Sequence, residues 1–161
     1  VAKLSFASLA SAMEPAPPVE PGIAEERKRY RVCVVGCGAI GTHIAARLAW
    51  GGKASVAAIA RGETLAALRR GGTVHAKEGA KEFRLDCVCD SASGIGRVDA
   101  VVVAVKATQL PSLAGTLSVL LQDADPELPV FFGINGIPWY YFQGQGGARE
   151  GQRLPLADPG G

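Results

Sequence analysis

The chain has 161 residues, a formal net charge of +2 and an apolar content of 48%. This length is typical of one domain with a sizeable hydrophobic core. Lysine and arginine form no block beside aromatic residues, so the sequence gives no indication of nucleic-acid binding. No stretch is apolar for long enough to span a bilayer, and we expect a cytoplasmic protein.

Residues 1–29 are predicted to form a disordered tail rich in Ala, Ser and Pro. Residues 1–13 do not begin with Met and lack the sustained apolar core of a secretory signal. Two interpretations fit them: a disordered N-terminus and the remains of an organelle transit peptide. The Pro-rich stretch at residues 14–22 can form neither helix nor sheet. The folded domain is therefore expected over residues 30–143, followed by a Gly-rich loop over residues 144–161.

A short segment near the start of this domain organises the rest of the chain. The apolar, β-branched run from Val32 to Val35 predicts a strand buried on both faces. Three glycines follow it with the spacing G-x-G-x-x-G, namely Gly36, Gly38 and Gly41. Apolar residues then recur at helical spacing as far as about Trp50, namely Ile40, Ile44 and Leu48. Strand, glycine turn and helix in this order are the context of a dinucleotide-binding fingerprint.

Each glycine of this turn has a predicted task. Gly36 makes the tight turn, Gly38 lets the backbone approach a pyrophosphate, and Gly41 lets the helix pack closely on the strand. The helix N-terminus adds unpaired N–H groups and a partial positive charge. A purely structural glycine turn is the weaker alternative.

The end of the second predicted strand, residues 54–60, indicates which dinucleotide is bound. NAD-binding domains usually place an Asp or Glu about 20 residues after the glycine turn, where it holds the ribose 2′-hydroxyl. Here Arg61 occupies the strand end and no acid is present. A guanidinium can pair with a 2′-phosphate, which a carboxylate would repel, so Arg61 predicts NADP(H). The alternative is a surface Arg that ends a strand.

The remaining pattern predicts an α/β fold of the Rossmann type: a doubly wound, mainly parallel sheet with helices on both faces. The run from Asp99 to Lys106 predicts a central strand, and Val130–Phe132 a further short one. Two further helices are expected, one over Glu63–Arg70 and one that begins at Pro111. Residues 73–76 and 81–89 are predicted to form an antiparallel hairpin or an irregular excursion at the sheet edge.

Two polar residues follow strand ends, where ligands bind in open α/β sheets. Lys106 could contact the cofactor ribose or a substrate carboxylate, although a snorkelling surface Lys fits nearly as well. Asn135, in an Asn-Gly turn, could direct its carboxamide toward the nicotinamide end of a cofactor, or could serve only the turn.

The four cysteines, Cys33, Cys37, Cys87 and Cys89, do not have the spacing of a zinc site, and no metal is predicted. Cys87 and Cys89 alternate along a probable strand and are expected to point to the same face. Free thiols in a reducing compartment are the favoured interpretation.

The sequence resembles the N-terminal half of the ketopantoate reductases, also called 2-dehydropantoate 2-reductases. The resemblance covers residues 30–161 and depends on Gly36–Gly41 with Arg61, on Val105-Lys-Ala107 and on Asn135-Gly-Ile-Pro-Trp139. It implies NADPH-dependent reduction of ketopantoate to pantoate, on the route to pantothenate and coenzyme A. It further implies that the cradle Gly36, Cys37, Gly38, Ala39, Ile40 and Gly41 holds the pyrophosphate and that Arg61 holds the 2′-phosphate. Lys106 would contact the cofactor, and Asn135 would contact both the nicotinamide end and the substrate.

The family also has a second, helical domain, which supplies the lysine that acts as general acid. No catalytic residue is therefore expected in this chain, which we interpret as a partial gene product whose helical domain is missing in cis or supplied in trans. Such a chain is expected to expose an apolar face and to self-associate. A homodimer is one form that this association could take. A non-catalytic NADP(H)-binding module and a reductase of another branched 2-oxo acid are the alternatives.

Overall fold

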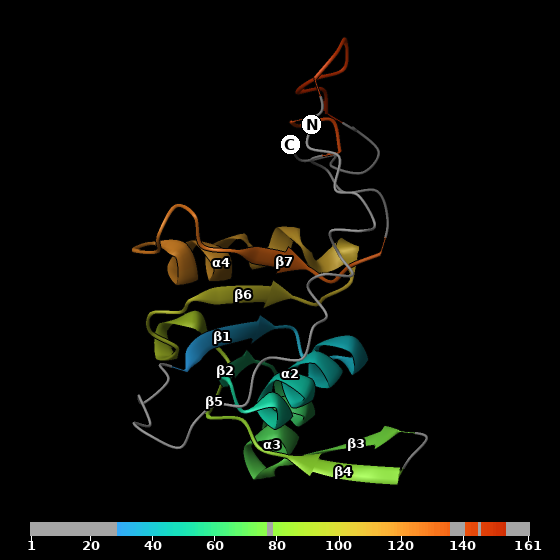
Figure 1. Cartoon of the computed structure of the whole chain (residues 1–161), viewed down its shortest axis with the longest axis vertical. Coiled ribbons are helices and arrows are strands. Elements are labelled where there is room, and N and C mark those ends of the chain that lie inside the picture. The colour runs from blue at the N-terminus through green and yellow to red at the C-terminus, as the bar shows by residue number, and fades with distance from the viewer. Residues whose placement is uncertain (1–28, 77–78, 136–140, 145, 154–161) are drawn as a thin grey trace, which may run out of the picture.

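A five-stranded parallel sheet forms the centre of the computed structural model, which describes residues 29–76, 79–135, 141–144 and 146–153. The strand order is β5-β2-β1-β6-β7 (Figure 1). The strands span Tyr30–Val35 (β1), Ala54–Ile59 (β2), Cys87–Cys89 (β5), Ala100–Val103 (β6) and Val130–Phe132 (β7). Every neighbouring pair in this sheet is parallel. The predicted Rossmann-type sheet is confirmed, and β1 and β6 lie inside it as their continuous apolar runs require.

Helices cover both faces of the sheet. On one face, helix α2 (Ala39–Gly51) packs its buried Ala45 and Ala46 against Val34, Val56 and Ala58. Helix α3 (Gly62–Arg70) adds Leu68 to the same cluster. On the other face, the turn η2 (Ala92–Gly94), the turn η4 (Pro111–Leu113) and helix α4 (Ala114–Leu121) cover the sheet. Their buried side chains Ala92, Leu113 and Leu120, together with Ile95, pack against Cys33, Val35, Val101 and Val103.

The predicted extended stretch over residues 81–89 is divided between two sheets. Strand β4 (Gly79–Phe83) pairs in antiparallel fashion with β3 (Gly72–Ala76), so the predicted hairpin forms, but it is a separate two-stranded sheet. The side chain of Trp50 fastens the hairpin to the end of α2, because its Nε1 donates to the Glu82 carbonyl at 2.8 Å. The Trp50 ring also meets the Phe83 ring edge-on, with 6.3 Å between centroids.

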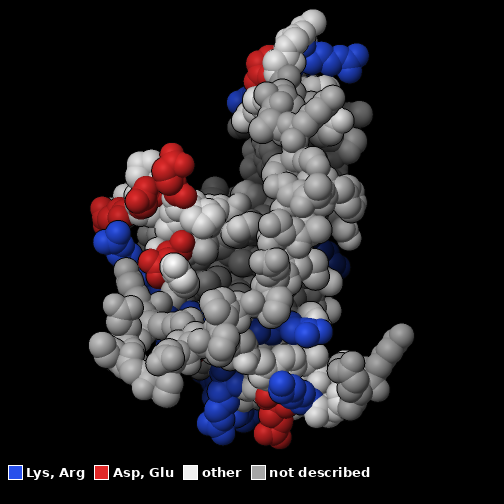
Figure 2. Space-filling model, in the orientation of Figure 1, with Lys and Arg blue, Asp and Glu red and all other residues white. Residues whose placement is uncertain are grey.

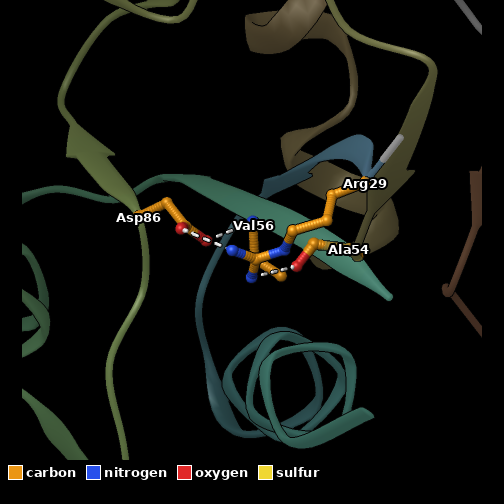
Figure 3. A network of polar contacts seen from close by, with 4 residues as sticks. All are labelled: Arg29, Ala54, Val56 and Asp86. Atoms are coloured by element: carbon orange, nitrogen blue, oxygen red, sulfur yellow. Dashed lines mark hydrogen bonds and ion pairs between the residues drawn. The ribbon is translucent and has the colours of Figure 1, made fainter. Parts of the chain in front are cut away.

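Asp86 returns the chain to the main sheet (Figure 3). Its backbone N–H donates to the Val56 carbonyl at 3.0 Å, and its Oδ2 accepts the Val56 N–H at 2.8 Å. Arg29 lies on the other side of the carboxylate, with Nη1 3.9 Å from Oδ1, and its Nη2 donates to the Ala54 carbonyl at 3.0 Å. The chain just before β5 is therefore fixed to β2 at three points.

The predicted third helix begins at Pro111 as a 3₁₀ turn and becomes α-helical at Ala114, and its side chains Leu113 and Leu120 are buried. Figure 2 shows acidic side chains over the loop between α4 and β7, and basic ones over α3 and the hairpin. Within the residues that the structure describes, no helix is long and apolar enough to cross a membrane. No group of three or more potential metal ligands occurs among those residues either.

Residues 141–153, apart from position 145, form a series of turns beyond the sheet (Figure 1). The Glu150 carboxylate accepts the backbone N–H groups of Gly144 and Gly146, and the Gly151 N–H donates to the Phe142 carbonyl at 2.9 Å. The Tyr141 and Phe142 rings meet edge-on, with 5.2 Å between their centroids. The predicted tail, except Arg29, and the segment from Gly136 to Trp139 lie outside the described residues.

Candidate functional site

A cleft of about 630 Å³ opens at the carboxyl ends of the parallel strands. It is lined by the residues that follow β1, β2, β6 and β7. The chain leaves β1 toward β2 on one side and reaches β6 on the other, so the cleft lies where the strand order reverses. Ligands of open α/β sheets bind at such a switch point.

The turn after β1 can be built only with glycine at its first and last positions. Gly36 has a φ of +89°, and a Cβ there would overlap Cγ1 of Val105 and lie 3.1 Å from the Ala104 carbonyl oxygen. A Cβ on Gly41 would overlap the carbonyl oxygen of Gly36 and lie 3.2 Å from Cβ of Ala104. These two glycines thus bring the turn, α2 and the end of β6 into close contact.

Gly38 differs from its two neighbours in the motif. It has an ordinary φ of −69°, and a Cβ built on it would meet no atom within 4 Å. Nothing in the fold therefore demands glycine at this position. The space beside it belongs to the cleft, where a ligand could approach the backbone closely.

The N-terminus of α2 faces this space. Gly38 is its N-cap and provides no side-chain cap, and the first turn contains no acidic residue. The first intrahelical hydrogen bond runs from the Thr42 N–H to the Gly38 carbonyl at 2.9 Å. The N–H groups before it have no helical partner, and they give the helix end a partial positive charge that favours an anion.

The other residues of the turn present backbone and apolar surface to the cleft. Ala39 and Ile40 line it, and Ile40 is 61% exposed. Cys37 also borders it, but its side chain is 5% exposed and belongs to the core under α2. Burial raises the pKa of the Cys37 thiol to about 11, so it stays protonated at neutral pH. Gly41 lies behind the cleft and packs the helix instead of lining it.

Arg61 lies at the end of β2, beside the cleft, and is the N-cap of α3. Its side chain is exposed and has no hydrogen-bond or ion-pair partner among the described residues. The preceding residue, Ala60, is fixed by a 3.0 Å bond from its N–H to the Cys89 carbonyl of β5. The backbone beneath Arg61 is therefore held while its guanidinium can reach a ligand.

Lys106 and Asn135 line the opposite part of the cleft, after β6 and β7. Lys106 is the N-cap of the turn η3 (Ala107–Gln109); its N–H donates to Oε1 of Gln109 at 3.2 Å, and its carbonyl accepts the Gln109 N–H at 2.8 Å. The turn thus uses only the backbone of Lys106 and leaves the exposed ammonium available. Gly133 fixes the start of the Asn135 segment by donating to the Val103 carbonyl at 2.8 Å.

The structure adds polar cleft residues that sequence reasoning missed: Thr64, Gln109, Ser112 and Thr116. They lie on α3 and on the turns and helix after β6, where no motif marks them; their place shortly after a strand end was the available signal. Among the described lining residues, Arg61 and Lys106 carry positive charge and none is acidic. The cleft therefore favours an anionic ligand.

Comparison with protein families decides the affiliation of the chain. Residues 32–137 match the family described as "Ketopantoate reductase PanE/ApbA". The chain belongs to the ketopantoate reductase family. The match includes the glycine turn, Arg61, Lys106 and Asn135, and so covers every element that surrounds the cleft.

Individual relatives agree with this membership. A 2-dehydropantoate 2-reductase of Mesorhizobium japonicum is 36% identical over 131 residues, which are 81% of this chain and 39% of that protein. A crystal structure from Ralstonia solanacearum MolK2, assigned as a ketopantoate reductase, superposes with a TM-score of 0.73 at 36% identity, over 83% of this chain and 40% of the other. A 2-dehydropantoate 2-reductase structure from Porphyromonas gingivalis W83 gives 0.53 at 26% identity, over 58% and 35%. This chain thus spans about two fifths of the length of its curated relative.

Proposed function

We propose that this chain is the NADP(H)-binding part of a reductase that converts a 2-oxo acid, 2-dehydropantoate, to its 2-hydroxy acid, pantoate. Residues 30–143 would form the cofactor-binding domain, with a tail before it and the loop of residues 144–161 after it. The substrate follows from the family, because the curated relative is named a 2-dehydropantoate 2-reductase. The cofactor is argued from the residues of the cleft.

The observation that carries the proposal is the combination of close packing and open space in one glycine turn. Gly36 and Gly41 are required by the fold, whereas Gly38 borders empty cleft where any side chain would intrude on a ligand. A pyrophosphate fits this arrangement, since it needs close backbone approach and N–H donors at a helix N-terminus. The Arg61 guanidinium, at the end of the neighbouring strand, is suited to a 2′-phosphate.

Each cleft residue then has a role in holding the reactants. The backbone from Gly36 to Ile40 would hold the pyrophosphate, and Gly41 would keep α2 close enough for its N-terminus to contribute. Lys106 would bind the cofactor or the substrate carboxylate, and Asn135 would orient the nicotinamide end and the substrate. Bound NADPH supplies the hydride that reduces the keto carbon.

Reduction of the keto group also requires a proton on the developing alkoxide. Positioned proton donors contribute typically ~10²–10⁴-fold in rate. Lys106 is the one amine among the described residues that line the cleft, and the proposed cofactor contact already occupies it. We therefore assign the proton donor to a further domain, joined to this one or supplied by a partner chain, and expect the 161 residues alone to bind NADPH without rapid turnover.

Titration of the purified chain with NADPH and with NADH, followed by nicotinamide fluorescence, tests the proposal. NADPH should bind at least tenfold more tightly than NADH, because a charged hydrogen bond contributes about 1.5–3 kcal/mol. Arg61→Ala should abolish most of that preference and leave NADH binding unchanged. Arg70→Ala is the matched control, since Arg70 is an exposed arginine of α3 that does not line the cleft. Equal affinity for the two nucleotides in the unsubstituted chain would refute the role of Arg61.

A further inference from the structure

Cys87 and Cys89 form a pair of neighbouring thiols at the edge of the main sheet. Their Sγ atoms are 3.4 Å apart, on the same face of β5, and both side chains are partly exposed. Cys33 and Cys37, in contrast, are buried. We propose that Cys87 and Cys89 are a redox-active dithiol whose oxidation to a disulfide loosens the backbone that carries Arg61. The consequence for cofactor affinity rests on the proposed function above; the disulfide itself does not.

The geometry of the pair allows the bond and also requires the strand to contract. A disulfide has an S–S length of about 2.05 Å, so the two sulfur atoms must approach by somewhat more than 1 Å. Two residues of a parallel strand rise about 6.6 Å, close to the ~6.8 Å upper limit for the Cα separation of a disulfide, which is most often about 5.5–6 Å. β5 has three residues and a neighbour on one side only, so it can adapt.

The two ends of β5 differ in how firmly they are held. Before the strand, Asp86 is fixed to Val56 by hydrogen bonds of 3.0 and 2.8 Å and faces Arg29 (Figure 3). At the other end, beyond the pairing of Cys89 with Ile59 in the sheet, the Cys89 carbonyl accepts one hydrogen bond, from the Ala60 N–H at 3.0 Å. Contraction should therefore move the Cys89 end, and that movement strains the bond to Ala60.

Ala60 precedes Arg61 directly and lines the cleft itself. A second link runs from Nε of Arg69, in the last turn of α3, to the Val88 carbonyl between the two thiols at 3.2 Å. Strand β5 is thus joined both to Ala60, the residue before Arg61, and to the last turn of α3. A change in the shape of β5 can therefore reach Arg61 by two routes. The shorter route is the hydrogen bond between Cys89 and Ala60, and the longer one runs from Arg69 through α3.

The chemistry needs an oxidant of the peroxide class and a dithiol reductant. One thiolate attacks the peroxide O–O bond to give a sulfenic acid and hydroxide; the second sulfur then attacks that sulfur, forms the S–S bond and expels the hydroxyl oxygen as water. In sum, two thiols and one hydrogen peroxide give one disulfide and two waters. A small dithiol reverses the reaction by thiol–disulfide exchange and is itself oxidised.

The test treats the chain with hydrogen peroxide, blocks the remaining thiols by alkylation, and maps the peptides by mass spectrometry. The expected product is a Cys87–Cys89 disulfide that dithiothreitol reverses, with Cys33 and Cys37 still alkylatable after denaturation. Hydrogen exchange at the Ala60 amide should become about fivefold faster in the oxidised chain, and NADPH should bind about fivefold more weakly, as expected for the loss of one backbone hydrogen bond. The double variant Cys87→Ser, Cys89→Ser should show none of these responses.

The outcomes separate the two proposals. Sulfinic acids or intermolecular disulfides in place of the Cys87–Cys89 bond would overturn the dithiol. Disulfide formation with unchanged exchange at Ala60 would overturn the link to Arg61. If the reduced chain does not bind NADPH, the proposed function fails, while peptide mapping and exchange at Ala60 still decide the redox proposal.

Discussion

Alanine at Gly41 should lower stability and alanine at Gly38 should weaken NADPH binding, because the two glycines serve different purposes. A Cβ on Gly41 would overlap the Gly36 carbonyl oxygen and lie 3.2 Å from Cβ of Ala104, so α2 must move away from the turn. Overpacking of this kind costs typically ~1–3 kcal/mol or more, of which the better helix propensity of alanine recovers up to ~1 kcal/mol. We expect Gly41→Ala to lower the free energy of unfolding by about 1–2 kcal/mol.

Gly38→Ala should leave stability nearly unchanged. Its φ of −69° is open to any residue, and the added methyl group meets no protein atom within 4 Å. Alanine is a somewhat poorer N-cap than glycine, but it also reduces the entropy of the unfolded chain, so the net effect should stay within about 0.5 kcal/mol. The methyl group would, however, project toward the proposed pyrophosphate and should weaken NADPH binding at least tenfold, or ~1.4 kcal/mol.

Urea unfolding followed by circular dichroism, together with NADPH titration of the same samples, measures both quantities. The unfolding slope should be unchanged in both variants, so that a shift in midpoint reports stability. The proposed role of Gly38 is refuted if Gly38→Ala binds NADPH as tightly as the unsubstituted chain while remaining folded. The packing role of Gly41 is refuted if Gly41→Ala has the same urea midpoint as the unsubstituted chain.

Two further outcomes are expected. Lys106→Gln should keep the stability within ~0.5 kcal/mol, because the turn η3 uses only the backbone of Lys106, and should weaken NADPH binding about tenfold in the fluorescence titration. Burial, followed by the nearby thiols, raises the pKa of Cys33 from 9.0 to about 12. The unfolded chain therefore loses this proton near pH 9 while the folded chain keeps it, so stability is full below pH 9 and falls between pH 9 and 12 by at most about 1.4 kcal/mol per pH unit for this thiol. Urea midpoints at pH 8, 9 and 10 should show this slope, and Cys33→Ala should flatten it; equal slopes would contradict the assignment.

The parallel pairing of the strands was predicted from their continuous apolar runs, and the position of the cleft follows because parallel strands bring their carboxyl ends to one edge. Arg61, Lys106 and Asn135 are distant in sequence, but each follows an apolar run that predicts a strand. The structure brings these three residues to one cleft. Their roles toward a ligand stay predictions.

The division of residues 81–89 between two sheets was not predictable from strand propensity. Residues on both sides of Asp86 are compatible with extended backbone, and the choice of partner depends on a side chain that accepts the Val56 N–H across the sheet. Trp50 is a similar case, since its bond to the Glu82 carbonyl joins elements 32 residues apart. Such long-range polar contacts have no local signature in sequence.

The cysteine pair shows which features a periodic sequence pattern can predict and which depend on the packing of side chains. Alternation along a strand correctly predicted that Cys87 and Cys89 share a face, but their 3.4 Å separation depends on rotamers and on the packing of Gly94, where a Cβ would lie 3.0 Å from Sγ of Cys89. A glycine at this position leaves room for the two thiols to face one another. The same pair lies on the strand whose last carbonyl accepts the Ala60 N–H, so the proposed disulfide would act on the end of β2, which carries Arg61.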